Sequence, residues 1–345
     1  MAQHARPHLL ICTQVVDADD PVLGFFHQWI EAFSKQYETV SVICLKRGRL
    51  SLPPNVSVYS LGKENGVSRI KYILNFYRYL WQLRKQYDAV FVHMNPEYMV
   101  LGGAWWRLMR IPVGLWYVHK SITWRLRIAV FFSSVVFTAV PESFRLASKK
   151  VRVVGQGIAT DVFRIKDTVT HDELRIITVG RIAESKRVID MLSVLDVLAR
   201  ENVPFSFTIV GAPAISEDVA YQARLKEEVA RRAYASDVHF LGALAPRELP
   251  AVLAEADIFL NLGKTGGLDK AVLEAMSCGV VPVTTNGAFR ELLSPLGLFV
   301  GSDDPEAIAE AIQHARSIDP VLLHSMVEKD HSLIALIPKI LSALQ

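Results

Sequence analysis

The sequence predicts an α/β protein made of two doubly wound domains, each with a parallel sheet covered by helices. Apolar, β-branched runs alternate with helical patterns along almost all of the 345 residues, which is typical of parallel sheets buried on both faces. The length exceeds what one core commonly fills. Charge is also divided: residues 1–166 hold 22 Lys and Arg against 10 Asp and Glu, a net of +12, whereas residues 167–345 hold 16 against 25, a net of −9.

Each predicted strand is a short apolar run. In the first half we expect strands at 8–16, 39–45, 56–59, 89–94, 113–118, 135–140 and 151–154. Apolar residues at helical spacing predict helices between them, at 23–35, 69–87, 98–109 and 123–132. In the second half we expect strands at 174–179, 205–210, 238–241, 257–262, 280–283 and 298–300.

The polar stretch 163–171 separates the two series of strands. We therefore expect domains at 1–166 and 167–331, with a last helix at 332–345 that can pack back on the first domain. Ligands of open α/β sheets bind at the carboxyl ends of strands, so two such domains are expected to face a central cleft.

Composition favours a cytoplasmic globular protein, with 51% apolar and 21% charged residues. The apolar run 128–140 is shorter than the roughly 20 residues that cross a bilayer. Cys12, Cys44 and Cys278 lie in apolar runs without metal-ligand spacing, as reduced core cysteines do. The run 9–16 carries Thr13 and Gln14 and indicates a first strand instead of a signal peptide.

The segment 265–276 reads Thr-Gly-Gly-Leu-Asp-Lys-Ala-Val-Leu-Glu-Ala-Met, between two apolar runs. This order predicts a strand, a glycine loop and a helix, whose first backbone N–H groups attract an anion. A carboxylate inside the helix suits sugar hydroxyls better than phosphate. The segment therefore predicts a nucleotide site, with these donor-binding candidates: Gly266, Gly267, Leu268, Asp269, Lys270 and Glu274.

Two cations follow the predicted strand 174–179. Arg181 and Lys186 flank a turn and a helix start, where they can neutralise a diphosphate and stabilise it as it departs. The alternative is that both are solvated surface charges.

Together these motifs resemble the retaining nucleotide-sugar glycosyltransferases of family 4, which have the GT-B fold. The resemblance rests on Gly180-Arg181, Lys186, the glycine loop, Leu273-Glu274-Ala275-Met276, Cys278-Gly279 and Pro282-Val283, and on Val153–Ile158 with Asp161 and Phe163. It covers nearly all of the second half and little of the first. It implies an acceptor-binding first domain and a donor-binding second domain.

The resemblance also implies roles for single residues. Arg181 and Lys186 would hold the donor diphosphate, Glu274 the ribose hydroxyls, and amides near Gly267 and Leu268 the phosphate. The family often carries two glutamates with seven residues between them. Counting back from Glu274 puts the first at Gly266, and Asp269 or Lys270 is a candidate replacement. Catalysis would rest on positioning and on stabilising the leaving diphosphate, without a protein nucleophile.

Two candidates lie in the first half. His119 ends a predicted strand where the family has a histidine beside the reacting sugar, although a lone histidine is often structural. Gly24 follows the first strand and would allow a ligand close to the backbone. Asp17-x-Asp19 matches a metal motif of another glycosyltransferase fold at the wrong position, so we expect no required metal and no cofactor. Gly155-x-Gly157 lacks a third glycine, since Thr160 follows, which disfavours an oxidoreductase.

Within the helix predicted at 69–87, the segment 69–85 carries a polar stripe that spans about 80° of arc. It is formed by Lys71, Asn75, Arg78, Gln82 and Lys85. Its aromatic neighbours, extended by Trp105 and Trp106, suit an anionic membrane surface; ordinary packing between helices is the alternative. The core is then expected to take Ile70, Ile73, Leu74, Tyr77 and Leu80.

The sequence therefore predicts a retaining, metal-independent hexosyltransferase that uses a UDP- or GDP-sugar. We expect a glycan or lipid-linked acceptor in polysaccharide or glycolipid biosynthesis, contact with the inner face of the plasma membrane, and no nucleic-acid partner. The alternatives are a non-catalytic nucleotide-sugar or glycan-binding protein of the same fold and, in third place, a nucleotide-sugar epimerase.

Overall fold

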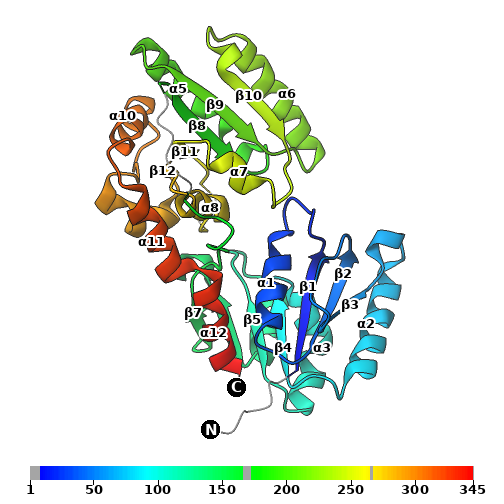
Figure 1. The fold of residues 1–345 in the computed structure, drawn as a ribbon. Helices are drawn as coiled ribbons and strands as arrows, with labels where there is room; N and C mark the ends of the chain where they lie inside the picture. The colour runs from blue at the N-terminus through cyan, green and yellow to red at the C-terminus, as the bar shows by residue number, and fades with distance from the viewer. Residues whose placement is uncertain (1–7, 166–171, 265–266, 345) are drawn as a thin grey trace. The chain divides into compact units, whose positions relative to one another are not determined.

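The computed structural model describes residues 8–165, 172–264 and 267–344, which form two α/β units (Figure 1). The first unit runs to Ala159 and resumes at Asp330, and the second is Thr160–Lys329. The division therefore falls earlier than residue 166. Ile158 explains this position, because its backbone exchanges hydrogen bonds of 2.7 Å with His331 and Leu333, which ties the loop to the C-terminal helix.

The sheet of the first unit is parallel, with the order β3-β2-β1-β4-β5-β6-β7. Its central strands are buried on both faces, which explains their continuous apolar runs. The strands predicted for the first half are confirmed as β1 (Leu9–Val16), β2 (Val40–Arg47), β3 (Val56–Ser60), β4 (Ala89–His93), β5 (Val113–Trp116), β6 (Val135–Thr138) and β7 (Val151–Val153).

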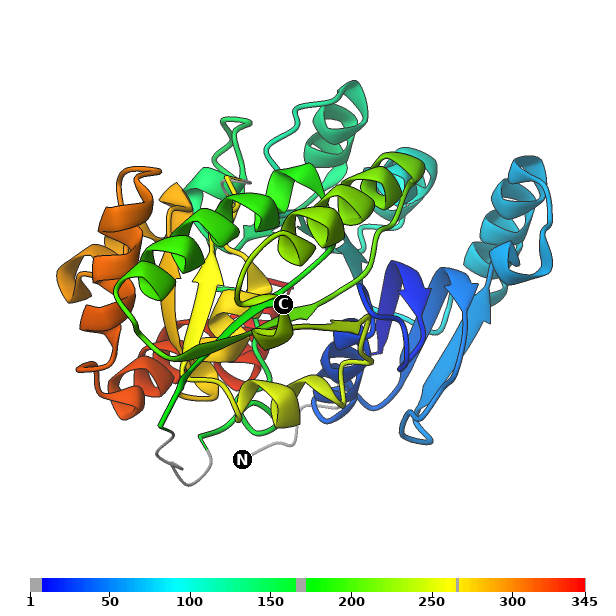
Figure 2. The same ribbon diagram turned by 90° about the horizontal axis from the view of Figure 1, so that it is seen from above.

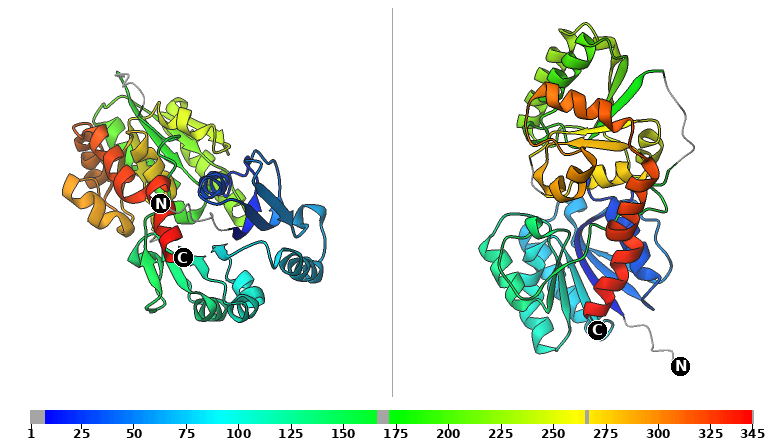
Figure 3. Two further views of the ribbon diagram at one scale, coloured as in Figure 1. Left: turned by 60° about the horizontal axis from the view of Figure 1, so that its bottom comes forward. Right: turned by 90° about the vertical axis from the view of Figure 1, so that its left-hand side faces the viewer.

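Two apolar clusters cover the faces of this sheet, and alternate residues of β1 enter each of them. One cluster includes residues of α1 (Phe25–Ser34) and α12 (Leu333–Leu344). The C-terminal helix thus returns to the first unit (Figures 1 and 3). The other cluster includes residues of α2 (Arg69–Leu83), α3 (Pro96–Leu108) and α4 (Trp124–Phe132).

The sheet of the second unit is also parallel, with the order β10-β9-β8-β11-β12. Its strands are β8 (Leu174–Val179), β9 (Phe205–Val210), β10 (Val238–Gly242), β11 (Ile258–Asn261) and β12 (Val281–Thr284). Figure 2 shows α5 and α6 side by side across this sheet. The helices are α5 (Val188–Arg200), α6 (Ser216–Ala230), α7 (Leu249–Leu253), α8 (Lys270–Ser277), α9 (Arg290–Leu293), α10 (Pro305–Ala315) and α11 (Pro320–His331).

The strand predicted at 298–300 is wrong. Only Phe299 pairs with Thr284, as an isolated bridge. Gly297, directly before the predicted segment, has a left-handed conformation with φ 69°. The extended segment that follows is too short to add a strand to the sheet.

Each sheet has a switch point, where the strand order reverses direction. It lies between β1 and β4 in the first unit and between β8 and β11 in the second. Because all strands are parallel, their carboxyl ends lie at one edge of each sheet. Ligands of doubly wound folds bind outside these ends at the switch point. In the second unit, the segments that follow β8 and β11 are therefore the place to look for a site.

Candidate functional site

Glycines at the ends of β8 and β9 allow two strand ends to approach closely. A Cβ on Gly211 would lie 1.8 Å from the carbonyl oxygen of Gly180, which no side chain tolerates. Lys186 passes over the same place, since a Cβ on Gly180 would meet its Cε at 3.2 Å. The absence of a side chain at Gly180 leaves room for the lysine at the switch point.

Lys186 forms an ion pair with Asp269, which also accepts a hydrogen bond from the Asn261 amide at 3.2 Å. Asp269 is the N-cap residue of α8, yet its side chain makes no capping hydrogen bond. An N-cap aspartate usually accepts from the first amides of its helix. Here the carboxylate is directed to Lys186 instead, so the amides at the start of α8 remain suited to an anion.

Glu274 lies one turn into α8 and is 6% exposed. It forms an ion pair with Lys270, whose ammonium group also lies 5.6 Å from the centre of the Phe163 ring. Burial raises the pKa of Glu274, and the neighbouring Lys270 offsets only part of this effect. A carboxylate kept in an unfavourable environment beside a helix start is typical of a functional position.

Arg181 has a different partner from Lys186. Its Nε lies 3.6 Å from Oδ2 of Asp218 at the start of α6, and the arginine is 48% exposed while the aspartate is 7% exposed. The structure therefore joins Lys186, Asp269, Lys270 and Glu274 through neighbouring ion pairs, whereas Arg181 is directed to α6. Gly266 lies outside the described residues.

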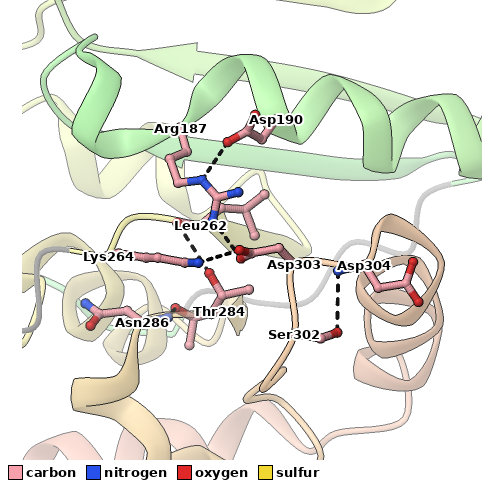
Figure 4. Close-up of polar contacts among 10 residues, drawn as sticks. Arg187, Asp190, Leu262, Lys264, Thr284, Asn286, Ser302, Asp303 and Asp304 are labelled. Carbon is pink, nitrogen blue, oxygen red and sulfur yellow. Dashed lines mark hydrogen bonds and ion pairs between the residues drawn. The ribbon is translucent and has the colours of Figure 1, made fainter.

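A second ion-pair group, which the sequence did not indicate, follows β11 (Figure 4). Lys264 forms an ion pair with Asp303. Arg187, which directly precedes α5, pairs with the same carboxylate, with 2.7 Å between its Nη1 and Oδ1 of Asp303. Both cations lower the pKa of Asp303. The position of Lys264, directly before the glycine loop, was a usable signal. Its partner 39 residues away was not.

The candidates of the first unit lie after β1 and β5. His119 is exposed, and its Nδ1 accepts a hydrogen bond from the backbone N–H of Ser121 at 3.0 Å. The ring hydrogen of the neutral form is then on Nε2, which can act as a donor. Gly24 is buried with φ −60°, so its conformation does not require glycine.

The Asp17-x-Asp19 pair is engaged within the protein. Asp19 forms an ion pair with Arg49, and Asp17 accepts from the backbone of Asp19 and Arg49 at 3.0 and 3.1 Å. Among the described residues, no group of three or more His, Cys, Asp or Glu is arranged to hold a metal ion. Independence from metal stays a prediction.

The structure corrects the faces assigned to α2. Its buried residues are Phe76, Leu80 and Leu83, whereas the exposed apolar residues are Ile70, Ile73, Leu74, Tyr77 and Trp81. Helical periodicity shows which residues share a face, and the cluster that packs on the sheet decides which face is buried. Lys71, Arg78 and Lys85 are exposed.

Trp106 is fully buried, and its Nε1 donates to the Tyr87 hydroxyl at 3.2 Å. Its assignment to a membrane-facing surface is therefore wrong, because the ring fills the cluster under α3. Trp105 is partly buried, with its ring 6.2 Å from that of Trp81.

Comparisons with known proteins match the second unit in sequence. Residues 173–317 match the family model described as "Glycosyl transferases group 1". The amylovoran biosynthesis glycosyltransferase AmsK of Erwinia amylovora is 27% identical over 190 residues, 51% of this chain and 45% of that protein. The GDP-mannose:cellobiosyl-diphosphopolyprenol alpha-mannosyltransferase of Xanthomonas oryzae is 24% identical over 171 residues, 49% of this chain and 44% of that protein. The chain thus spans less than half the length of these two relatives.

The similarity in structure extends over the whole chain. The crystal structure of Anabaena Alr3699/HepE in complex with UDP and glucose has a TM-score of 0.74 and 15% sequence identity, with 99% of both chains covered. At this identity the likeness shows the fold alone. The chain therefore has the GT-B fold, and its second unit carries the sequence pattern of the group 1 glycosyl transferases.

Proposed function

We propose that this protein is a retaining glycosyltransferase that moves a hexose from a nucleoside-diphosphate sugar to a glycan or lipid-linked acceptor in polysaccharide or glycolipid biosynthesis. One observation carries the proposal. Lys186, the uncapped start of α8 and the buried Glu274 lie together at the switch point of the unit that matches the family model. A diphosphate with an attached ribose needs a cation, backbone amides and a hydroxyl acceptor, and this group provides all three.

In this proposal the protein supplies fixed charge instead of a nucleophile. Lys186 and the amides of Gly267 and Leu268 stabilise the diphosphate as it leaves, and Arg181 adds a second positive charge after β8. Glu274 accepts hydrogen bonds from the ribose hydroxyls. His119 donates from Nε2 to the donor sugar. Preorganised charges of this kind commonly provide the largest share of catalysis, and with two cations present the proposal requires no metal.

A donor screen tests the proposal directly. We expect a UDP- or GDP-sugar, at about 100 times its Kd, to raise the melting temperature by several degrees, since this concentration stabilises by about 2.7 kcal/mol. The donor is then incubated with and without EDTA, and sugar release or transfer is followed. Unchanged melting with every nucleotide sugar would contradict the proposal.

Two other results would redirect it. Binding without turnover indicates the non-catalytic alternative, which the glycine at the position of the family's first glutamate favours. A sugar epimer formed without acceptor indicates an epimerase.

We also propose that the outer face of α2 contacts an anionic membrane at the inner face of the plasma membrane. Ile70, Leu74 and Trp81 are 71%, 64% and 61% exposed, and cations flank them at Lys71, Arg78 and Lys85. A group of exposed apolar side chains beside lysines and arginines is typical of interfacial helices. No described helix is long and apolar enough to cross a bilayer.

Vesicle flotation tests this surface. We expect the protein to float with vesicles that contain phosphatidylserine at low salt, and less so at 1 M salt, where charges are screened. The triple variant Ile70→Ser/Leu74→Ser/Trp81→Ser should lose about tenfold or more in binding, because it removes most of the apolar area. Val321→Ser/Leu322→Ser, which changes exposed apolar residues of α11, is the control. Equal flotation of the triple variant would contradict the assignment.

A further inference from the structure

A buried asparagine holds the loop that precedes α8. Asn286 is fully buried, and its Nδ2 donates to the carbonyl oxygen of Gly267 at 3.0 Å. Its Oδ1 accepts from the backbone N–H of Ala288 at 3.2 Å. Because one bond needs a donor and the other an acceptor, the amide has a single satisfactory orientation.

This hydrogen bond sets the direction of the next amide. In a trans peptide the C=O and the following N–H point in opposite directions. When Asn286 draws the Gly267 carbonyl into the interior, the N–H of Leu268 is turned to the opposite side. That N–H lies directly before the N-cap of α8, so it adds one donor to the amides at the start of the helix.

Two more buried side chains connect Asn286 to the other side of Leu268. Thr284 Oγ1 accepts from the backbone N–H of Asn286 at 3.0 Å and donates to Oδ1 of Asn261 at 3.0 Å. Asn261 Nδ2 donates to Asp269 at 3.2 Å. Thr284 and Asn286 are both labelled in Figure 4. Gly267 and Asp269 are thus held on both sides of the Leu268 peptide.

We propose that Asn286 is a positioning residue for the sugar donor, which aims the Leu268 N–H at the donor diphosphate. The inference rests on the proposed function and adds a specific role to a residue outside the predicted site. Thr284 and Asn261 act through the same hydrogen-bonded chain. The recognised group is the diphosphate, not the base or the ribose.

The test replaces Asn286 by aspartate. In Asn286→Asp one oxygen still accepts from Ala288, but the other faces the Gly267 carbonyl, and two acceptors repel each other. The carbonyl is expected to turn away and the Leu268 N–H with it. By calorimetry the Kd for UDP or GDP, whichever the wild type binds, should rise about tenfold or more. The Kd for the nucleoside without phosphates should stay unchanged.

Asn55→Asp is the matched control. Asn55 donates from Nδ2 to the carbonyl oxygens of Ser34 and Tyr37 at 2.9 and 3.2 Å, in the first unit. The same chemical change there should lower the melting temperature without changing nucleotide affinity. This control separates a general loss of stability from a lost phosphate contact.

The outcomes distinguish a failure of the proposed function from a failure of the role of Asn286 alone. If the wild type binds neither nucleoside diphosphate, the proposed function fails. If the wild type binds one and a folded Asn286→Asp binds it equally well, only the role of Asn286 is wrong. Should Asn286→Asp fail to fold, Thr284→Val repeats the measurement, because it removes the hydroxyl that holds the Asn286 backbone. Wild-type diphosphate affinity in that variant would overturn the inference.

Discussion

Replacing Lys186 by alanine is expected to lower kcat/KM for the sugar donor by about 10²- to 10³-fold. The lysine lies at the switch point, where it forms an ion pair with Asp269 and packs closely over Gly180. Its loss removes positive charge from the leaving diphosphate. It also leaves the Asp269 carboxylate without its cation, close to the start of α8. Steady-state donor kinetics of Lys186→Ala and the wild type provide the measurement.

Two further variants make this prediction specific. Lys226→Ala removes an exposed lysine of α6 whose ammonium group lies 5.7 Å from the Phe240 ring, and it should retain wild-type kinetics. Lys186→Ala/Asp269→Asn should recover part of the donor affinity, because the uncompensated carboxylate is gone. A Lys186→Ala enzyme within threefold of the wild type would show that the diphosphate binds elsewhere.

Replacing Glu274 by glutamine is expected to weaken nucleoside-diphosphate binding by about 10- to 100-fold, since hydrogen bonds to a charged acceptor are stronger than neutral ones. The 2′-deoxy nucleotide identifies the contact. The wild type should discriminate against it, whereas Glu274→Gln, whose amide oxygen accepts a weaker hydrogen bond, should discriminate less. Calorimetric titrations with the two nucleotides measure the difference. Undiminished discrimination in the variant would remove Glu274 from the ribose site.

The same substitution has a predicted pH signature. Burial raises the folded-state pKa of Glu274 above its ordinary value of 4.5. In this range the folded state holds more protons than the unfolded state, so the contribution to stability is full below pH 4.5 and is lost as the pH rises through the raised pKa. Glutamine cannot ionise. The melting temperature of Glu274→Gln relative to the wild type should therefore be higher at pH 7.5 than at pH 4.

A relative melting temperature that falls as the pH rises would mean that ionised Glu274 stabilises the fold through Lys270. Weaker binding combined with higher relative stability at neutral pH is the pattern of a residue retained for a ligand.

Most of the secondary structure could be read from local patterns. The apolar run of β1 indicates a strand buried on both faces, and the structure places it there. The runs of β8 and β9 are also confirmed as strands, although Arg175, Ser206 and Thr208 in them are only partly buried. Phe299 is an exception, because its short apolar segment resembles the others but follows a left-handed glycine and pairs at one residue only. For the proposed donor site, the glycine loop before α8 and the cations after β8 could be found in the sequence, because strand ends and helix starts carry local signals.

The amino-acid sequence by itself determined the two series of strands, the place of Lys186 after β8 and the place of Glu274 in the helix after β11, because periodicity, glycines and helix starts are local properties of the chain. Only the tertiary structure decided which residues these side chains contact. Lys186 meets Asp269 across 83 residues, and Asn286 reaches Gly267 across 19. The buried face of α2 was also decided there. Its two apolar faces are similar in sequence, and only packing on the sheet leaves Ile70, Leu74 and Trp81 outside.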